Sequence, residues 1–340
     1  MRILAVPADN GGCRYARLTV PLRQLEALGH EVTWADRLTP CADGHTMPVH
    51  ELLKFDAVVF QRPATTATAQ LIRELARASP LARRPRIVVD LDDDLWEIPR
   101  SNPAHAAYGR NALALLTQCC RDADVVTAST HALAQVVRDR TGAPCAVLPN
   151  RLPPARPGGE PPPPADDRPT ILWAGSGTHD DDIAVAHAAV RAVLNATGGR
   201  LRIIGHCSRR LFRGIDKEVV RWIPNVEAYH RALQGTVAIA PLRDNEFNRC
   251  KSDIKLKEYM QAGIPVVASP VGPYLEALQR GCPVLLAVTP SEWRQQLTRV
   301  MMHARVREDL SIDSAWWADS VRIDRGRIIQ RWVEAYSAPR

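Results

Sequence analysis

The chain has only five lysines, and three of them, Lys251, Lys255 and Lys257, lie within seven residues. On a helix, Lys251, Lys255 and Glu258 would share one face, at spacings of four and three residues. Lysines beside the free N–H groups of a helix start can hold phosphate oxygens, and a carboxylate about two turns further on can accept hydrogen bonds from ribose hydroxyls. The segment therefore predicts either a nucleoside diphosphate site or a solvated helix face with a weak lysine–glutamate pair.

The flanking residues predict the elements that would position these charges. Val237–Ala240 and Val266–Ala268 are apolar, strand-like runs, and between them Ser252 can cap a helix that Gly263 ends in a left-handed turn. A strand, a helix and a strand form the crossover unit of a parallel sheet. Because open α/β sheets bind ligands beyond the carboxyl ends of their strands, this position favours the ligand site.

The run DNEFNRCKSDIKLKEYMQAGIPVVAS, residues 244–269, resembles the donor-site helix of retaining glycosyltransferases with the GT-B fold. It is most similar to a family 4-like branch with the pattern N-x-x-K-S-x-x-K-x-x-E-Y. The resemblance implies that Glu258 binds the ribose and that the helix start holds the diphosphate. The donor-binding residues of that segment would be Asn248, Lys251, Ser252, Lys255 and Glu258. Cys250 stands where the family often has a glutamate that touches the transferred sugar.

A second candidate donor loop follows the strand predicted at 170–174. Gly175, Ser176 and Gly177 at a helix start could cradle a phosphate, or the loop could be a simple helix cap. The family's arginine and lysine clamp is replaced by Ser176 and Asp181, but the narrower branch pattern G-S-x-x-H-x-x-D is present. The resemblance implies that Gly175 and Ser176 bind the donor, and that His179 replaces the clamp by a hydrogen bond or a charge.

The acceptor side is predicted from two loops of the first half of the chain. A glycine-bearing loop follows the strand at 2–6, and glycine lets a backbone approach a ligand closely, although a simple tight turn is the alternative. The resemblance implies that this loop reaches the cleft between two domains. The predicted acceptor-binding residues are Asn10, Gly11, Gly12, Arg14, Tyr15 and, after the strand at 57–60, Arg62.

Asp92, Asp93 and Asp94 follow the strand predicted at 86–90. They could contact the acceptor as a base or hydrogen-bond acceptor, cap the next segment, or bind Mg²⁺. The resembled branch has a similar D-x-D-D-x-L-W pattern on the acceptor side, and its donor binding needs no metal. The predicted catalytic residues are therefore Asp92, Asp93, Lys251 and His179, with no metal site.

Alternating strand and helix patterns around a proline-rich stretch predict an α/β chain with two Rossmann-like domains facing across a cleft. The expected domains are residues 1–150, on the acceptor side, and 170–315, on the donor side, joined by a linker at 151–169. The resemblance implies that the last helix, at about 316–340, packs back on the first domain. The tryptophans of this tail suit that packing.

The composition limits the kinds of ligand and partner that we expect this protein to bind. The net charge of +7 comes from dispersed arginines, without the basic stripe and interleaved aromatics that nucleic-acid binding favours. The eight cysteines lack metal-like spacing, and no glycine fingerprint of dinucleotide enzymes is present. With no apolar run of membrane-spanning length and no signal peptide, we expect a cytoplasmic protein, with peripheral contact at the inner membrane face left open.

The predicted function is transfer of a sugar from a UDP- or GDP-sugar to a hydroxyl acceptor on a saccharide, cell-surface glycan or natural product. The resemblance implies retention of configuration, without a metal or other cofactor. Two alternatives remain: a homologue that binds the nucleotide sugar but is inactive, and an inverting transferase that uses Asp92 or Asp93 as its base.

Overall fold

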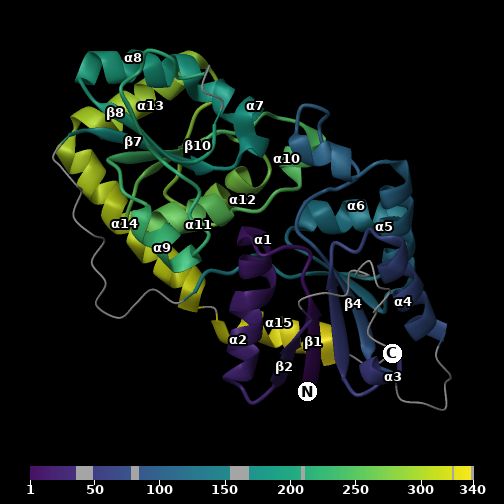
Figure 1. Ribbon diagram of the computed structural model, residues 1–340. Coiled ribbons are helices and arrows are strands. Elements are labelled where there is room, and N and C mark those ends of the chain that lie inside the picture. The colour runs from purple at the N-terminus through teal and green to yellow at the C-terminus, as the bar shows by residue number, and fades with distance from the viewer. Residues whose placement is uncertain (36–48, 78–83, 154–167, 208–210, 324, 338–340) are drawn as a thin grey trace.

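The computed structural model of the chain describes residues 1–35, 49–77, 84–153, 168–207, 211–323 and 325–337 (Figure 1). Two six-stranded sheets, all of whose strand pairs are parallel, form separate domains. This confirms the predicted α/β architecture of two Rossmann-like domains. The first sheet has the order β2-β1-β3-β4-β5-β6, with β1 Arg2–Val6, β2 Glu31–Trp34, β3 Ala57–Gln61, β4 Arg86–Leu91, β5 Val125–Ala128 and β6 Cys145–Val147.

The second sheet repeats this organisation in the order β12-β11-β10-β7-β8-β9. Its strands are β7 Thr170–Gly175, β8 Arg200–Gly205, β9 Lys217–Val220, β10 Val237–Ala240, β11 Val266–Ala268 and β12 Leu285–Leu286. The direction of winding reverses between β1 and β3 in one sheet and between β7 and β10 in the other. At such a reversal the loops after the two strands diverge and leave room for a ligand.

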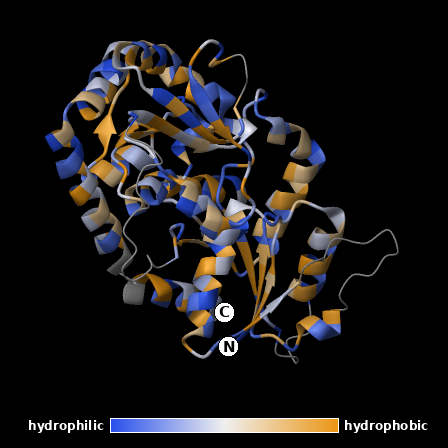
Figure 2. Cartoon of the chain, turned by 60° about the vertical axis from the view of Figure 1, so that its left-hand side comes forward, coloured by the Kyte–Doolittle hydropathy of each residue, from blue (hydrophilic) through white to orange (hydrophobic). Residues whose placement is uncertain are grey.

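Helices cover both faces of each sheet, which explains why the central strands are continuously apolar (Figure 2). Those of the first domain are α1 Gly12–Arg14, the π-helical turn η1 Tyr15–Thr19, α2 Val20–Glu26, α3 Val49–Leu52, α4 Thr66–Arg77, the 3₁₀ turn η2 Pro103–Ala107, α5 Arg110–Asp122 and α6 His131–Thr141. No described helix of the chain is long and apolar enough to cross a membrane.

The second domain begins with short turns and ends with long helices. After β7 come η3 Gly177–His179, α7 Asp180–Ile183, η4 Ala184–Ala186 and α8 His187–Thr197. The later helices are α9 Val226–Ala232, α10 Glu246–Arg249, α11 Ile254–Gln261, α12 Pro273–Gln279, α13 Pro290–Met302, α14 Ala304–Ile323 and α15 Arg325–Ser337.

Local capping decides the limits of two helical stretches. Between β4 and β5, Asn102 caps η2 and Gly109 precedes α5 in an extended conformation. Ser252 does not cap the donor helix: α11 begins at Ile254 with Asp253 as its N-cap residue. Lys251 therefore precedes the helix and does not share the stripe of Lys255 and Glu258. The left-handed ending is confirmed, with Gly263 at φ 68°.

The tryptophans of the two C-terminal helices pack in different domains. In Figure 1, α15 lies beside the first sheet, where it packs on α2 and β4. Trp332 is buried in the first-domain core, whereas Trp317 is buried in the second-domain core and Trp316 is 71% exposed. The expectation that the tail tryptophans pack on the first domain is therefore wrong for Trp316 and Trp317. Residues 154–167 of the expected linker and 338–340 of the tail lie outside the described residues, so the domain limits stay a prediction.

A buried ion pair connects α15, the first sheet and the start of the interdomain segment. Arg17 and Asp90 are both inaccessible to solvent; Arg17 Nε donates to Asp90 Oδ2 at 3.2 Å and Nη2 to Oδ1 at 2.5 Å. Arg17 Nη1 donates to the Leu148 carbonyl and to Asn150 Oδ1, and its guanidinium lies 5.2 Å from the ring centre of Trp332. One buried cation thus holds three parts of the chain together.

We expect Asp90→Asn to lower the free energy of unfolding by about 3–5 kcal/mol, because it leaves the buried Arg17 charge uncompensated. The control is Asp244→Asn, which breaks an exposed pair with Arg249 and should cost about 1 kcal/mol or less. Urea unfolding followed by circular dichroism measures both. Equal effects of the two substitutions would contradict the structural role of Arg17.

Candidate functional site

The domains meet where a loop of the second domain inserts into the first. Phe247 on α10 and Cys250 just after it are 5% and 4% exposed, and both pack in the apolar core of the first domain. Thr130 Oγ1 at the start of α6 donates to the Cys250 carbonyl at 2.9 Å. Cys250 is therefore a packing residue, and burial raises the pKa of its thiol to about 12. It cannot replace the family's acidic sugar contact as a nucleophile at neutral pH.

Lys251 is the next residue, and it brings a cation to the first domain. Its Nζ lies 3.4 Å from Asp93 Oδ1 and 4.4 Å from the ring centre of Phe247. The pair joins the loop after β10 to the loop after β4, so two of the predicted catalytic residues meet across the domain boundary. Both side chains keep some exposure, 15% for Lys251 and 24% for Asp93, so ligand atoms can reach them.

Lys255 and Glu258 form the expected pair on α11, with Nζ 2.8 Å from Oε2. Tyr229 on α9 completes it, since its hydroxyl donates to Glu258 Oε2 at 2.9 Å and accepts from Lys255 Nζ at 2.8 Å. Burial alone would raise the pKa of Glu258, but Lys255 and His230 outweigh it and lower the pKa to about 2. Glu258 is therefore a fixed, ionised hydrogen-bond acceptor.

The loop after β7 lies beside these lysines. Ser176 precedes η3 and its Oγ lies 2.6 Å from Thr178 Oγ1, whereas His179 Nδ1 lies 2.9 Å from Asp182 Oδ2. A side chain at Gly175 would collide with the ring of Trp173, which explains the glycine. Asn248 is 2% exposed and lines the adjacent cavity, but its Nδ2 is engaged with Asp182 Oδ1 at 2.7 Å and with the Arg243 carbonyl at 2.9 Å.

A cavity of about 310 Å³ opens next to this loop and is lined by both domains. Pro99, Ser101 and Asn102 line it from the first domain. The second domain contributes two segments, Gly177–Asp182 without His179, and Arg243–Asn248 without Glu246. Most of the residues that line the cavity have polar side chains, and the cavity is large enough for a sugar ring.

The three aspartates after β4 have different surroundings. Asp92 is 6% exposed and is held by Arg62, whose Nε and Nη2 donate to its two carboxylate oxygens at 2.5 Å each. Burial raises the pKa of Asp92, but Arg62 dominates and lowers it to about 2. Asp94 caps the next turn by accepting from the Trp96 N–H at 3.1 Å, and burial raises its pKa to about 6. Asp93 is the member that faces Lys251.

Arg62 is constrained by its backbone as well as by its charge. It has φ 46° and is the only non-glycine residue with positive φ among those that the structure describes. Its Nη2 also donates to Cys13 Sγ at 2.9 Å and lies 3.7 Å from Asp93 Oδ2. Such strain persists where surrounding contacts fix the conformation, and it is frequent at functional sites. Arg62 therefore orients the two aspartates rather than pointing freely toward an acceptor.

The glycine-bearing loop lies beside Arg62 and also lines a second pocket at the domain boundary. Asn10, Gly11, Arg14 and Tyr15 line this pocket of about 280 Å³, together with the segment 224–227 at the start of α9. The rings of Tyr15 and His230 lie edge to face, 6.4 Å apart. Gly12 begins α1 beside this pocket. Arg62 contacts this loop, with Nη1 3.9 Å from Asp9 Oδ2 and Nη2 donating to Cys13 Sγ, while the residues that line the pocket face the α9 side of the donor domain.

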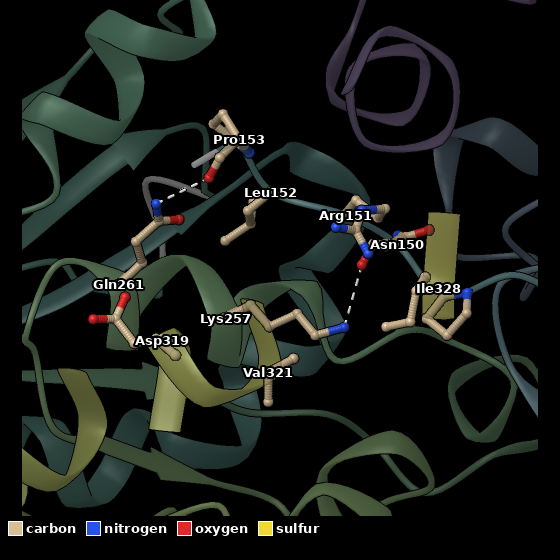
Figure 3. Close-up of a pocket in the computed structure, with 11 residues that line it drawn as sticks. Asn150, Arg151, Leu152, Pro153, Lys257, Gln261, Asp319, Val321 and Ile328 are labelled. Atoms are coloured by element: carbon tan, nitrogen blue, oxygen red, sulfur yellow. Dashed lines mark hydrogen bonds between the residues drawn. The ribbon is translucent and has the colours of Figure 1, made fainter. Parts of the chain in front are cut away.

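Ser252 lies apart from both groups, at the segment that connects the two domains. Its Oγ accepts from Asn150 Nδ2 at 2.8 Å, so in this structure it does not point to the lysine cluster. Figure 3 shows the adjacent pocket, where Lys257 and Gln261 of α11 donate to the carbonyls of Asn150 and Pro153 at 3.2 Å each. These contacts attach α11 to the interdomain segment.

Sequence reasoning missed three residues of the site: Asp182 as a partner of His179, and Tyr229 and His230 beside Glu258. The spacing of His179 and Asp182, one helical turn, could have indicated their contact. Nothing in the sequence pairs α9 with α11, because that contact depends on how the second domain folds. Among the described residues, no group of three or more His, Cys, Asp or Glu side chains is arranged to hold a metal ion.

Comparison with known proteins agrees with this architecture. Residues 168–303 match the family described as Glycosyl transferases group 1. No curated protein matches the sequence. Among solved structures, the chain resembles S. aureus TarM, crystallised with UDP, at a TM-score of 0.63 and 8% identity, covering 85% of this chain and 58% of that one.

Two further structures match over the full length of both chains. The E. coli trehalose-6-phosphate protein bound with UDP-2-fluoro glucose has a TM-score of 0.64 and 14% identity, with 100% of each chain covered. WaaG, a glycosyltransferase of lipopolysaccharide biosynthesis, has a TM-score of 0.65 and 13% identity, again with 100% of each chain covered. At these identities the likeness concerns the fold. The second domain therefore matches the glycosyl transferase group 1 family, and the chain as a whole has the architecture of a GT-B glycosyltransferase.

Proposed function

We propose that this glycosyltransferase moves a sugar from a UDP- or GDP-sugar to a hydroxyl acceptor with retention of configuration and without a metal. The observation that carries the proposal is the convergence of Lys251, Lys255, Glu258 and His179 beside a cavity that both domains line. UDP in the structure of TarM and a UDP-sugar analogue in the E. coli protein support the donor class.

The donor would bind along the second domain. Lys251 and Lys255 neutralise the diphosphate. Glu258 accepts hydrogen bonds from the ribose through Oε1, because Tyr229 and Lys255 both bond to Oε2. The transferred sugar then extends into the cavity between Asn102 and Asn245. The acceptor approaches from the first-domain side, near Asp93.

Catalysis requires stabilisation of the leaving diphosphate. As the bond between the sugar and the phosphate oxygen breaks, charge develops on that oxygen, and fixed lysines stabilise it more strongly in a dry site than in water. In same-face attack, the acceptor oxygen bonds to the anomeric carbon while the departing phosphate oxygen takes the acceptor's proton. In this route the protein only has to position the two substrates and stabilise the charge of the leaving phosphate.

The surroundings of the other candidate groups favour this route. Cys250 is buried with a raised thiol pKa, and Asp92 is tied to Arg62 with its pKa lowered to about 2, which makes it a poor base. Asp94 is 1% exposed and caps the Trp96 N–H, so an inverting mechanism would have to use Asp93. An inactive homologue is the other alternative, and slow release of sugar from a donor to water would exclude it.

We expect Glu258→Ala to weaken UDP or GDP binding by tenfold to a hundredfold, since lost hydrogen bonds to a charged group cost about 1.5–3 kcal/mol. Isothermal titration calorimetry measures the affinity. The matched control is Glu51→Ala, which removes the exposed pair with Lys54 at the same three-residue spacing in the other domain. Unchanged affinity in folded Glu258→Ala protein would refute the ribose assignment.

Activity should survive an excess of EDTA, because Lys251 and Lys255 supply the positive charge that a divalent cation supplies in metal-dependent transferases. Nucleotide release from a panel of UDP- and GDP-sugars, with and without EDTA, measures this. Complete loss of release that Mg²⁺ or Mn²⁺ restores would show that the transferase needs a metal.

The first product formed should keep the anomeric configuration of the donor, which proton NMR reads from the anomeric coupling. Asp93→Asn and Asp92→Asn should each lower the rate without abolishing it, since they position the acceptor and do not take its proton. An inverted coupling, together with complete loss of activity in Asp93→Asn, would make Asp93 the catalytic base.

A further inference from the structure

Asp182 connects the loop after β7 to the loop after β10. Its side chain is almost fully buried, and both of its oxygens are used. Oδ2 pairs with His179 Nδ1 at 2.9 Å, while Oδ1 accepts from the Arg243 N–H at 3.0 Å and from Asn248 Nδ2 at 2.7 Å. The carboxylate therefore fixes His179, on the loop after β7, against the loop after β10 that leads to Lys251.

This contact determines which nitrogen of His179 carries the proton. Burial raises the pKa of Asp182, but its hydrogen bonds to His179 and Arg243 N–H outweigh burial and lower the pKa, so the group is an ionised acceptor. An ionised carboxylate only accepts, and His179 must therefore donate from Nδ1. In the described part of the chain Nε2, on the opposite side of the ring, has no hydrogen-bond partner.

Without a ligand the ring is neutral near pH 7. Burial lowers the pKa of His179, Asp182 raises it, and the nearby cations Lys251 and Lys255 lower it further. A bound diphosphate would offset the lysine charges and bring negative oxygens near the ring, which raises a histidine pKa.

Other charged groups near the ring are already engaged. Asp93 faces Lys251 from the first domain, and the Arg243 guanidinium lies 3.8 Å from Asp181. His105 on η2, which packs against η3, has its Nδ1 2.8 Å from the Ile98 carbonyl. The groups that set the charge of His179 are therefore Asp182, the two lysines and the ligand.

We propose that Asp182 positions His179 as a proton-accepting group of the diphosphate subsite. As a diphosphate binds, the Nε2 lone pair takes a proton from solvent, and the new N–H donates to a phosphate oxygen. This inference rests on the proposed function, since it needs a diphosphate at the lysines. It explains how the site works with Ser176 and Asp181 in place of a permanent cationic clamp.

Two measurements test the proposal. Nitrogen-15 NMR of the free protein should show His179 as the Nδ1–H tautomer. Calorimetric titration with UDP, and with GDP in parallel, in buffers of different ionisation enthalpy near pH 7 should show proton uptake, with a dissociation constant that rises by up to about tenfold per pH unit between pH 7 and 8. Titration of the nucleotide's own phosphate is common to all variants and cancels in their comparison.

His179→Gln and Asp182→Asn should each lose this proton uptake. Their nucleotide affinity should be lower than that of the native protein at pH 7, and closer to it at pH 8. His206→Gln should retain the proton uptake, because His206 is an exposed histidine of the same region that bonds to Gly175 through its backbone. His230→Gln should also retain the proton uptake, because His230 lies beside Glu258, on the ribose side of the proposed donor site.

An Nε2–H tautomer in the free native protein would overturn the positioning role without any variant. UDP and GDP binding with no proton uptake, or with uptake that persists in His179→Gln, would overturn this inference and leave the proposed function intact. Failure of the native protein to bind either nucleotide would overturn both.

Discussion

The insertion of Phe247 and Cys250 into the apolar core of the first domain is the contact on which the rest of the site depends. Two domains held only by the chain segments that connect them would otherwise be free to change their separation, because interdomain contacts within a chain are usually small and polar. Here a loop of the second domain packs as if it belonged to the first, and burial of these side chains opposes separation. Lys251, the next residue, is consequently placed opposite Asp93.

The charges around this contact are arranged in pairs that differ in accessibility. Arg17–Asp90 and Arg62–Asp92 are buried and bidentate, and they fix the loops after β4 and β6 at considerable desolvation cost. Lys251–Asp93 is longer and more exposed. The buried pairs therefore act as supports, whereas in the proposed function the accessible pair exchanges its partner for a ligand phosphate. In that proposal Asp90 is structural, Asp92 acts through Arg62, and Asp93 and Lys251 face the substrates.

On the donor side, buried carboxylates likewise fix neighbouring groups, here through hydrogen bonds. Glu258 and Asp182 are both buried carboxylates whose pKa values are lowered by specific partners, Lys255 in one case and His179 in the other. Each carboxylate fixes the group that would touch the ligand. A buried network of this kind holds its members rigidly as long as every polar atom is satisfied. In the proposed function, this network prepares the site for a diphosphate before one binds.

The sequence by itself determined the elements and their parallel arrangement. Apolar runs separated by helical segments predict two Rossmann-like domains, because a strand buried on both faces has few other compositions. The Lys255–Glu258 pair and the left-handed turn at Gly263 also followed from local spacing, and the structure confirms both. These features depend on residues within one or two turns of each other.

Only the tertiary structure decided which distant groups meet. The sequence could not show that Arg62 would hold Asp92, that Ser252 would bond to Asn150 at the domain connection, or that Tyr229 would lie against Glu258. It also could not show that the Asn10–Tyr15 loop, which Arg62 contacts through Cys13, would face the start of α9. These contacts depend on strand order and on how the domains pack, and neither is encoded in the spacing of neighbouring residues.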